Sequence, residues 1–179
     1  MNKKLSRRIR KHIILFLFII LIIILWRYIY TGIIVVALIL LGGIAKIYKQ
    51  ITQISIGFEL ITPITILFAY TFGIMFAVIS AVIMLVIGEI ISSKVNFPAA
   101  VVQTIIYIII SMLAHAFNST DFIILAIILL VIRNILLFIL GILLLGTDYI
   151  QITILCIGSI FFNTLLITWL GEFFVNILG

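Results

Sequence analysis

Apolar residues follow one another along this chain in long blocks, and short polar breaks separate the blocks. A helix needs about 20 predominantly apolar residues to cross the hydrocarbon core of a bilayer. No break is longer than a few residues, so no extramembrane domain is expected. The pattern predicts an all-α fold, a polytopic transmembrane bundle of six or seven helices, over residues 12–30, 32–48, 54–71, 73–93, 98–117, 122–146 and 150–177.

The breaks carry residues that favour turns. They are Tyr30-Thr31-Gly32, Lys49-Gln50, Thr71-Phe72-Gly73, Lys94 to Pro98, Asn118-Ser119-Thr120-Asp121 and Gly146-Thr147-Asp148. The second and third blocks are short, and the third contains Pro63, so each is expected to be tilted, kinked or partly inserted. The region 12–48 is predicted to form either a helical hairpin or one long irregular element.

Composition supports membrane embedding. The 179 residues are 66% hydrophobic and 9% charged, whereas soluble domains are about 45–50% apolar and about 25% charged. So few polar side chains cannot cover a surface that faces water, which excludes a soluble globular protein. The apolar content also excludes a disordered chain.

Six of the eleven basic residues lie in residues 1–11. This basic tail precedes an apolar helix, so it is expected to bind anionic lipids, and nucleic-acid binding is not expected. Positive-inside bias places the N-terminus in the cytoplasm of a multi-pass cell-membrane protein. Residues 13–25 resemble the apolar part of a signal peptide, but Trp26 and the residues after it lack the small side chains that cleavage needs. We expect an uncleaved anchor.

The number of crossings before residue 48 sets the orientation of the later helices. With seven crossings, Lys46, Lys49 and Lys94 join the tail on the cytoplasmic side, giving nine basic residues there against Arg27 alone outside. With one crossing before residue 48, the three lysines move outside, leaving six basic residues inside against four. Charge bias therefore favours seven crossings.

Small residues form one helical stripe in the fourth block. Gly73, Ala77, Ala81 and Gly88 recur at intervals of four, four and seven, with Ser80 beside them. Small residues let helix backbones approach closely in lipid. We expect another helix of the same bundle against this face, with docking of a partner membrane protein as the alternative.

Ionisable residues inside the predicted helices form a candidate polar network. A charge at the centre of a membrane helix costs about 2.5–3.5 kcal/mol on the insertion scale, so Arg133, midway along the sixth block, should pair with a carboxylate. Glu59 and Glu89 are the candidates. A structural ion pair and a solute or ion pathway remain equal alternatives. The full candidate network is Arg133, Asn134, Glu59, Glu89 and Asn163.

Uncharged polar residues inside the blocks also need partners. Asn163, Gln103 and Thr104 are expected to form hydrogen bonds between helices. A further polar group gathers at membrane boundaries, where polar residues collect in any membrane protein. Its members are candidate solute-side residues: His115, Asn118, Asp121 and Glu172.

Several chemistries lack their motifs in this sequence. The chain has two histidines, and they are not at metal-binding helical spacing. It has no Walker loop, no Gly-x-Ser-x-Gly and no glycine-rich dinucleotide fingerprint. We therefore expect a protein that is not an enzyme and that has no cofactor and no metal site.

The stretch from Ile61 to Asn96 resembles a known pattern. An apolar helix, a Phe-Gly turn at Phe72-Gly73 and a small-residue helix ending in Glu89 and Ser92-Ser93 follow one another. This order is similar to the membrane-embedded S-components of energy-coupling-factor transporters. The cell-shape protein MreD shares the six-helix architecture, and Phe161 to Leu166 looks more like MreD.

The resemblance implies one of two functions. The first is a solute-binding subunit whose small-molecule solute moves when a partner ATPase complex engages it. The second is an MreD-like scaffold that recruits membrane proteins for envelope or cell-shape assembly. The S-component family usually has an alanine-xxx-alanine coupling face in its first helix, and neither 13–25 nor 32–46 contains one.

Overall fold

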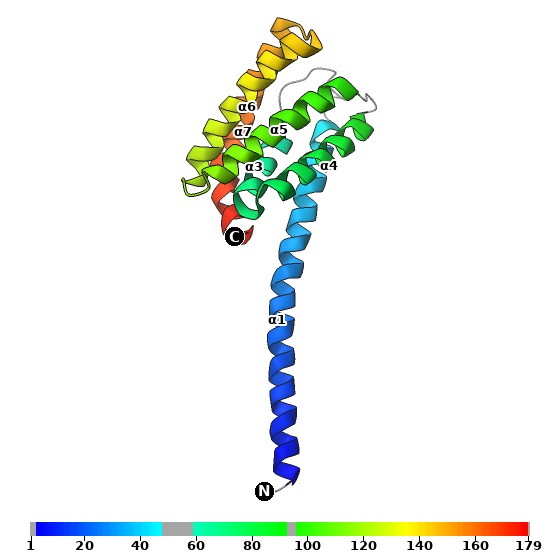
Figure 1. The fold of residues 1–179 in the computed structure, drawn as a ribbon, viewed down its shortest axis with the longest axis vertical. Coiled ribbons are helices and arrows are strands. Elements are labelled where there is room, and N and C mark those ends of the chain that lie inside the picture. The colour runs from blue at the N-terminus through cyan, green and yellow to red at the C-terminus, as the bar shows by residue number, and fades with distance from the viewer. Residues whose placement is uncertain (1–2, 48–58, 93–95, 179) are drawn as a thin grey trace. The chain divides into compact units, whose positions relative to one another are not determined.

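The computed structural model describes residues 3–47, 59–92 and 96–178, which are almost entirely helical (Figure 1). The chain divides into two units, Met1–Val36 and Ala37–Gly179. The described part of the first unit belongs to one helix, α1 (Lys3–Ile44), whose last turns belong to the second unit.

Helix α1 runs without interruption through Tyr30-Thr31-Gly32. The predicted break there is wrong, because residues 12–44 belong to one helix. Of the two alternatives for this region, the single long element therefore holds as far as Ile44, and the hairpin is wrong. A single glycine such as Gly32 does not stop a helix in lipid, because unpaired backbone groups in hydrocarbon cost several kcal/mol each. Helix α1 also begins inside the basic tail, at Lys3.

The remaining described helices belong to the second unit. With α1, the described residues form six α-helices and one 3-10 helix and contain no strand, which confirms the all-α prediction. The blocks predicted from residue 73 onward match their helices to within one residue at each end. The helices are η1 (Ala45–Ile47), α3 (Ile61–Phe72), α4 (Ile74–Ser92), α5 (Phe97–Ala116), α6 (Phe122–Leu145) and α7 (Tyr149–Leu178).

The helices end where the sequence places turn residues. Gly73, between α3 and α4, has φ of 91°, and Gly146, after α6, has φ of 59°, conformations that glycine adopts at little cost. The Asp121 carboxylate accepts the Ile124 N–H at 3.1 Å and caps α6. Asn96 caps α5 in the same way, accepting the Ala99 N–H at 3.2 Å. The predicted break at Lys49-Gln50, and Lys94, lie outside the described residues.

Five described helices are long and apolar enough to cross a membrane, which makes this a multi-pass helical bundle. Helix α3 is different, because it has 12 residues and is therefore about 18 Å long at 1.5 Å per residue. The hydrocarbon core is about 30 Å thick. The candidate spans are Tyr28–Ile47, Ile74–Ser92, Phe97–Ala116, Phe122–Leu145 and Tyr149–Leu178.

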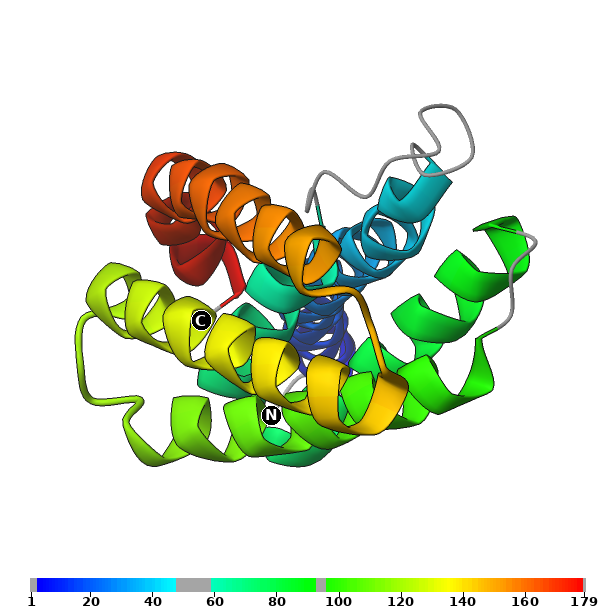
Figure 2. The same cartoon turned by 90° about the horizontal axis from the view of Figure 1, so that it is seen from above.

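The short helix α3 lies at the centre of the second unit. It contacts α4, α5, α6 and α7, which surround it when the bundle is seen from above (Figure 2). Eight of its twelve residues are buried. The last residues of α1 and η1 pack on α4, where an added Cβ at Gly43 would lie 2.5 Å from Ile87 Cγ2.

Candidate functional site

A charged and polar cluster lies inside the bundle, between α3, α5 and α6. The Arg133 side chain is 1% exposed, and its Nη2 lies 2.5 Å from Glu59 Oε2. The Tyr107 hydroxyl donates a hydrogen bond to the other carboxylate oxygen, Glu59 Oε1. Thr62 Oγ1 lies 3.4 Å from the Tyr107 hydroxyl. The predicted pairing of Arg133 with a carboxylate is confirmed, with Glu59 as the partner.

Asn134 extends this cluster on α6. Its Oδ1 accepts a hydrogen bond from Arg133 Nη1 at 3.3 Å. Its Nδ2 donates to the Leu130 carbonyl at 2.8 Å, which fixes the orientation of the amide. The guanidinium therefore contacts one charged and one neutral acceptor, as burial of an arginine requires.

Because α3 is short, Glu59 lies deep in the bundle. Arg133 is the twelfth of the 24 residues of α6, so the ion pair lies midway along that helix. Glu59 precedes α3, and α3 therefore begins at this same depth. Pro63 in the first turn removes one of the N–H groups that a buried helix start leaves unpaired. The carboxylate also lies at the positive end of the α3 dipole.

Glu89 belongs to a second ion pair and is not a partner of Arg133. Lys46 Nζ lies 2.9 Å from Glu89 Oε1, and the Asn96 N–H donates to Glu89 Oε2 at 3.2 Å. Lys46 is buried. The candidate network of the sequence is therefore split into separate groups.

Removing the charge of Lys46 is expected to destabilise the bundle. Lys46→Met keeps the length of the side chain but leaves the Glu89 carboxylate without its cation, so we expect a loss of about 1.5–3 kcal/mol. Thermal unfolding in detergent measures the loss. Lys46→Arg, which keeps the charge, should lose less, and equal stability of Lys46→Met and the unchanged protein would show that the pair contributes nothing.

Asn163 forms a third, separate polar group on α7. Its side chain is fully buried, and its Nδ2 donates to Ser159 Oγ at 3.1 Å within the same helix. Thr104 Oγ1 likewise donates to the Ala100 carbonyl of its own helix, at 2.9 Å. The predicted hydrogen bonds between helices are therefore wrong for Asn163 and Thr104. Gln103 Oε1 is buried and has no hydrogen-bond partner among the described residues.

The candidate solute-side residues lie at exposed positions: His115, Asn118, Asp121 and Glu172. The carboxylate of Asp121 caps α6. No hydrogen bond of the described residues joins these four side chains. Their role in solute binding stays a prediction.

The small-residue face of α4 packs inside the bundle. Ala77 and Ala81 are fully buried, and an added Cβ at Gly88 would lie 2.5 Å from Lys46 Cδ. This confirms the packing face within the chain rather than a free surface for a partner. Gly73 is not part of the face, because it forms the turn before α4.

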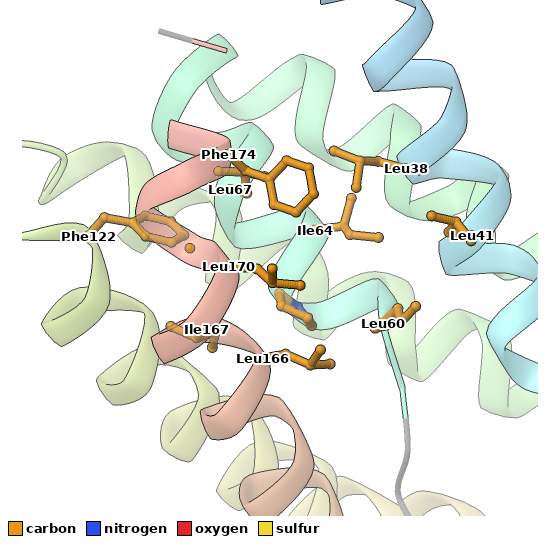
Figure 3. A pocket seen from close by; sticks show the side chains of 12 residues that line it. Leu38, Leu41, Leu60, Ile64, Leu67, Phe122, Leu166, Ile167, Leu170 and Phe174 are labelled. Carbon is orange, nitrogen blue, oxygen red and sulfur yellow. The ribbon is translucent and has the colours of Figure 1, made fainter. Parts of the chain in front are cut away.

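A groove that the sequence did not predict lies along α3 (Figure 3). Its volume is about 170 Å³. Leu60 and Leu166 stand at one end, and Phe174 stands with Leu38 at the other. The lining residues carry no polar side chain: Leu38, Leu41, Leu60, Pro63, Ile64, Leu67, Phe122, Leu166, Ile167, Leu170, Gly171 and Phe174. Apolar residues are so common in this chain that nothing in the sequence marked these twelve.

The fold and site define a multi-pass helical bundle with a short central helix and an ion pair at its core. Among the described residues, no group of three or more His, Cys, Asp or Glu side chains is arranged to hold a metal ion. No family model, no curated protein and no solved structure matches this chain.

Proposed function

We propose that this chain is a non-enzymatic, membrane-embedded solute-binding subunit of the S-component kind that works with partner transport proteins. One observation carries the proposal: helix α3 has 12 residues, too few to span a membrane, and begins, deep in the bundle, at a charged cluster. Transporters build solute sites near the bilayer midplane from discontinuous helices of this kind. Ionisable residues at that depth are expensive and are commonly functional.

The cluster supplies groups that recognise a solute. Glu59 offers a carboxylate that is 13% exposed, whereas Arg133 is 1% exposed. The hydroxyls of Tyr107 and Thr62 can each both donate and accept hydrogen bonds. In this proposal Arg133 holds Glu59 in place, and Glu59 and Tyr107 contact the solute.

The energy for transport comes from a partner in this proposal. The chain contains no Walker loop, so a separate ATPase complex moves the solute. The basic tail of residues 1–11 lies on the cytoplasmic face of the cell membrane, where anionic lipids attract it.

The test is whether the purified full-length protein retains a small molecule. We expect mass spectrometry of the detergent-solubilised protein to find a retained compound. Tyr107→Phe removes one hydroxyl at the cluster and should lower the retained amount several-fold, because a typical hydrogen bond contributes about 0.5–1.5 kcal/mol. Tyr70→Phe is the matched control, because the Tyr70 hydroxyl donates to the Thr120 carbonyl instead.

Two results would contradict the proposal. One is that no compound is retained above the level found with an unrelated membrane protein prepared in the same way. The other is that Tyr107→Phe and Tyr70→Phe retain equal amounts. Either result would favour the alternative, an MreD-like scaffold. Such a scaffold would need a surface other than Ala77 and Ala81, which are buried within the chain.

A further inference from the structure

Another groove lies between α4 and α5, and it has a charged residue in its lining. Its volume is about 380 Å³, and eight of its ten lining residues are apolar. The two others are Glu89 and Thr104. The Thr104 hydroxyl donates to the Ala100 carbonyl of its own helix, so Glu89 is the lining residue that can bind a polar ligand.

The carboxylate stands at the end of this groove that is close to the helix ends. Helix α4 ends at Ser92, three residues after Glu89, and the Asn96 N–H, directly before α5, donates to Glu89 Oε2 at 3.2 Å. Val82 also lines the groove, and it lies about 10 Å from Glu89 along α4, seven residues at 1.5 Å each. Because α4 is long and apolar enough to cross a membrane, Glu89 lies close to a membrane surface and the apolar lining extends from it into the hydrocarbon.

The ion pair of Lys46 and Glu89 turns its negative partner toward the groove. The Glu89 side chain is 18% exposed and the Lys46 side chain 5%, and Lys46 does not line the groove. A carboxylate has about four lone-pair sites. One hydrogen bond from Lys46 reaches Oε1 and one from the Asn96 N–H reaches Oε2, so each oxygen can accept another. The groove therefore offers acceptors to a ligand that carries a positive charge and N–H donors.

We propose that this groove binds a bilayer phospholipid whose head group carries a primary ammonium. The ammonium donates to Glu89, and part of one acyl chain lies along the apolar lining. A choline head group has no N–H to donate, and a head group without a cation has no charge to offer the carboxylate. The bilayer is the source, because lining residues such as Val86 and Ile90 are exposed on the outside of the bundle. The charged cluster around Arg133 is not part of this site, so the inference does not depend on the proposed function.

The test compares three lipids with identical acyl chains: phosphatidylethanolamine, phosphatidylcholine and phosphatidylglycerol. Each is titrated into the full-length protein in detergent, and native mass spectrometry counts the lipids bound. We expect the first phosphatidylethanolamine to bind with a Kd at least about fivefold lower than that of either other lipid, because only its head group forms a hydrogen bond between charged partners at Glu89.

Variants locate the lipid. Glu89→Gln keeps the size of the side chain but removes its charge, and it should abolish the preference for phosphatidylethanolamine over phosphatidylcholine. Ile105 lines the groove and Ile108 does not, and the two are similarly exposed on α5, at 45% and 39%. Ile105→Trp should fill the groove and weaken phosphatidylethanolamine binding several-fold. Ile108→Trp, the matched control, should leave this binding unchanged.

Three results would overturn the inference. Equal binding of phosphatidylethanolamine and phosphatidylcholine would mean that the groove holds bilayer lipid without regard to its head group. A preference that persists in Glu89→Gln would mean that the ammonium binds elsewhere. Binding that Ile105→Trp and Ile108→Trp weaken equally, or that neither weakens, would mean that the acyl chain lies outside the groove. This last comparison decides even if Glu89→Gln does not fold, because both tryptophan variants keep the ion pair with Lys46.

Discussion

Arg133→Leu is expected to destabilise the bundle by about 3–5 kcal/mol, the usual cost of breaking a buried ion pair by removing one partner. The stability is lost because the Glu59 carboxylate stays in the bundle after Arg133 is replaced. Glu59 would keep the hydrogen bond from Tyr107 but would have lost the cation that lies 2.5 Å from it. The free energy of unfolding in detergent, obtained by denaturant titration, measures the effect.

A double-mutant cycle separates the ion pair from the loss of packing around Arg133. Arg133→Leu combined with Glu59→Leu should be more stable than the sum of the single losses predicts, because the double variant removes both charges of the pair. We expect a coupling of about 1.5–3 kcal/mol, toward the upper end for residues in contact. Arg133→Leu with Glu89→Leu is the matched control, and it should be additive because Glu89 pairs with Lys46. Additivity in both combinations would contradict the pair.

The sequence predicted the helices after residue 73 well because each is bounded by residues that act locally. Gly146 adopts a left-handed conformation, and Asp121 and Asn96 cap the helices that follow them. These turn and cap residues can be recognised in the sequence without knowing which helices pack together. In lipid, an apolar run between two such signals forms a helix, because a helix pairs its backbone polar groups within the segment.

The region before residue 73 was predicted less well, because its structure depends on context. Gly32 resembled a turn residue, but nothing lies within 4 Å of an added Cβ there, and the helix continues through it. The start of α3 at Ile61 was not predicted, because residues 54–71 are apolar enough for a longer helix. Hydropathy does not show that a buried helix begins partway along an apolar run.

The sequence identified the members of the charged cluster but not all of their pairings. The free-energy cost of a charge inside a membrane helix indicated that Arg133 needed a carboxylate. That cost did not distinguish Glu59 from Glu89 as the partner. In the structure Lys46 pairs with Glu89, and Arg133 pairs with Glu59. Lys46 was counted with Lys49 and Lys94 among the cytoplasmic basic residues, but it is buried in that pair, which weakens its value for predicting orientation. Tyr107 was missed, because a tyrosine in an apolar helix carries no signal of a charged partner.

Enlarging the small-residue face is expected to have the second large effect on stability. Ala77→Leu and Ala81→Leu each add three carbons at a fully buried position on α4. Because α3 and α5 both pack on α4, the added atoms have no space without backbone shifts. Overpacking of this kind costs about 1–3 kcal/mol, and in lipid such close contact is also a main source of helix association.

The measurement is thermal unfolding in detergent, with a matched control at Ala116. That alanine is exposed at the end of α5, so Ala116→Leu makes the same chemical change without crowding. We expect both α4 variants to unfold at clearly lower temperatures and Ala116→Leu to unfold close to the unchanged protein. The double variant Ala77→Leu/Ala81→Leu should fall further, since the two sites lie one turn apart on the same face. Unchanged unfolding temperatures for both single variants would mean that no helix packs against this face.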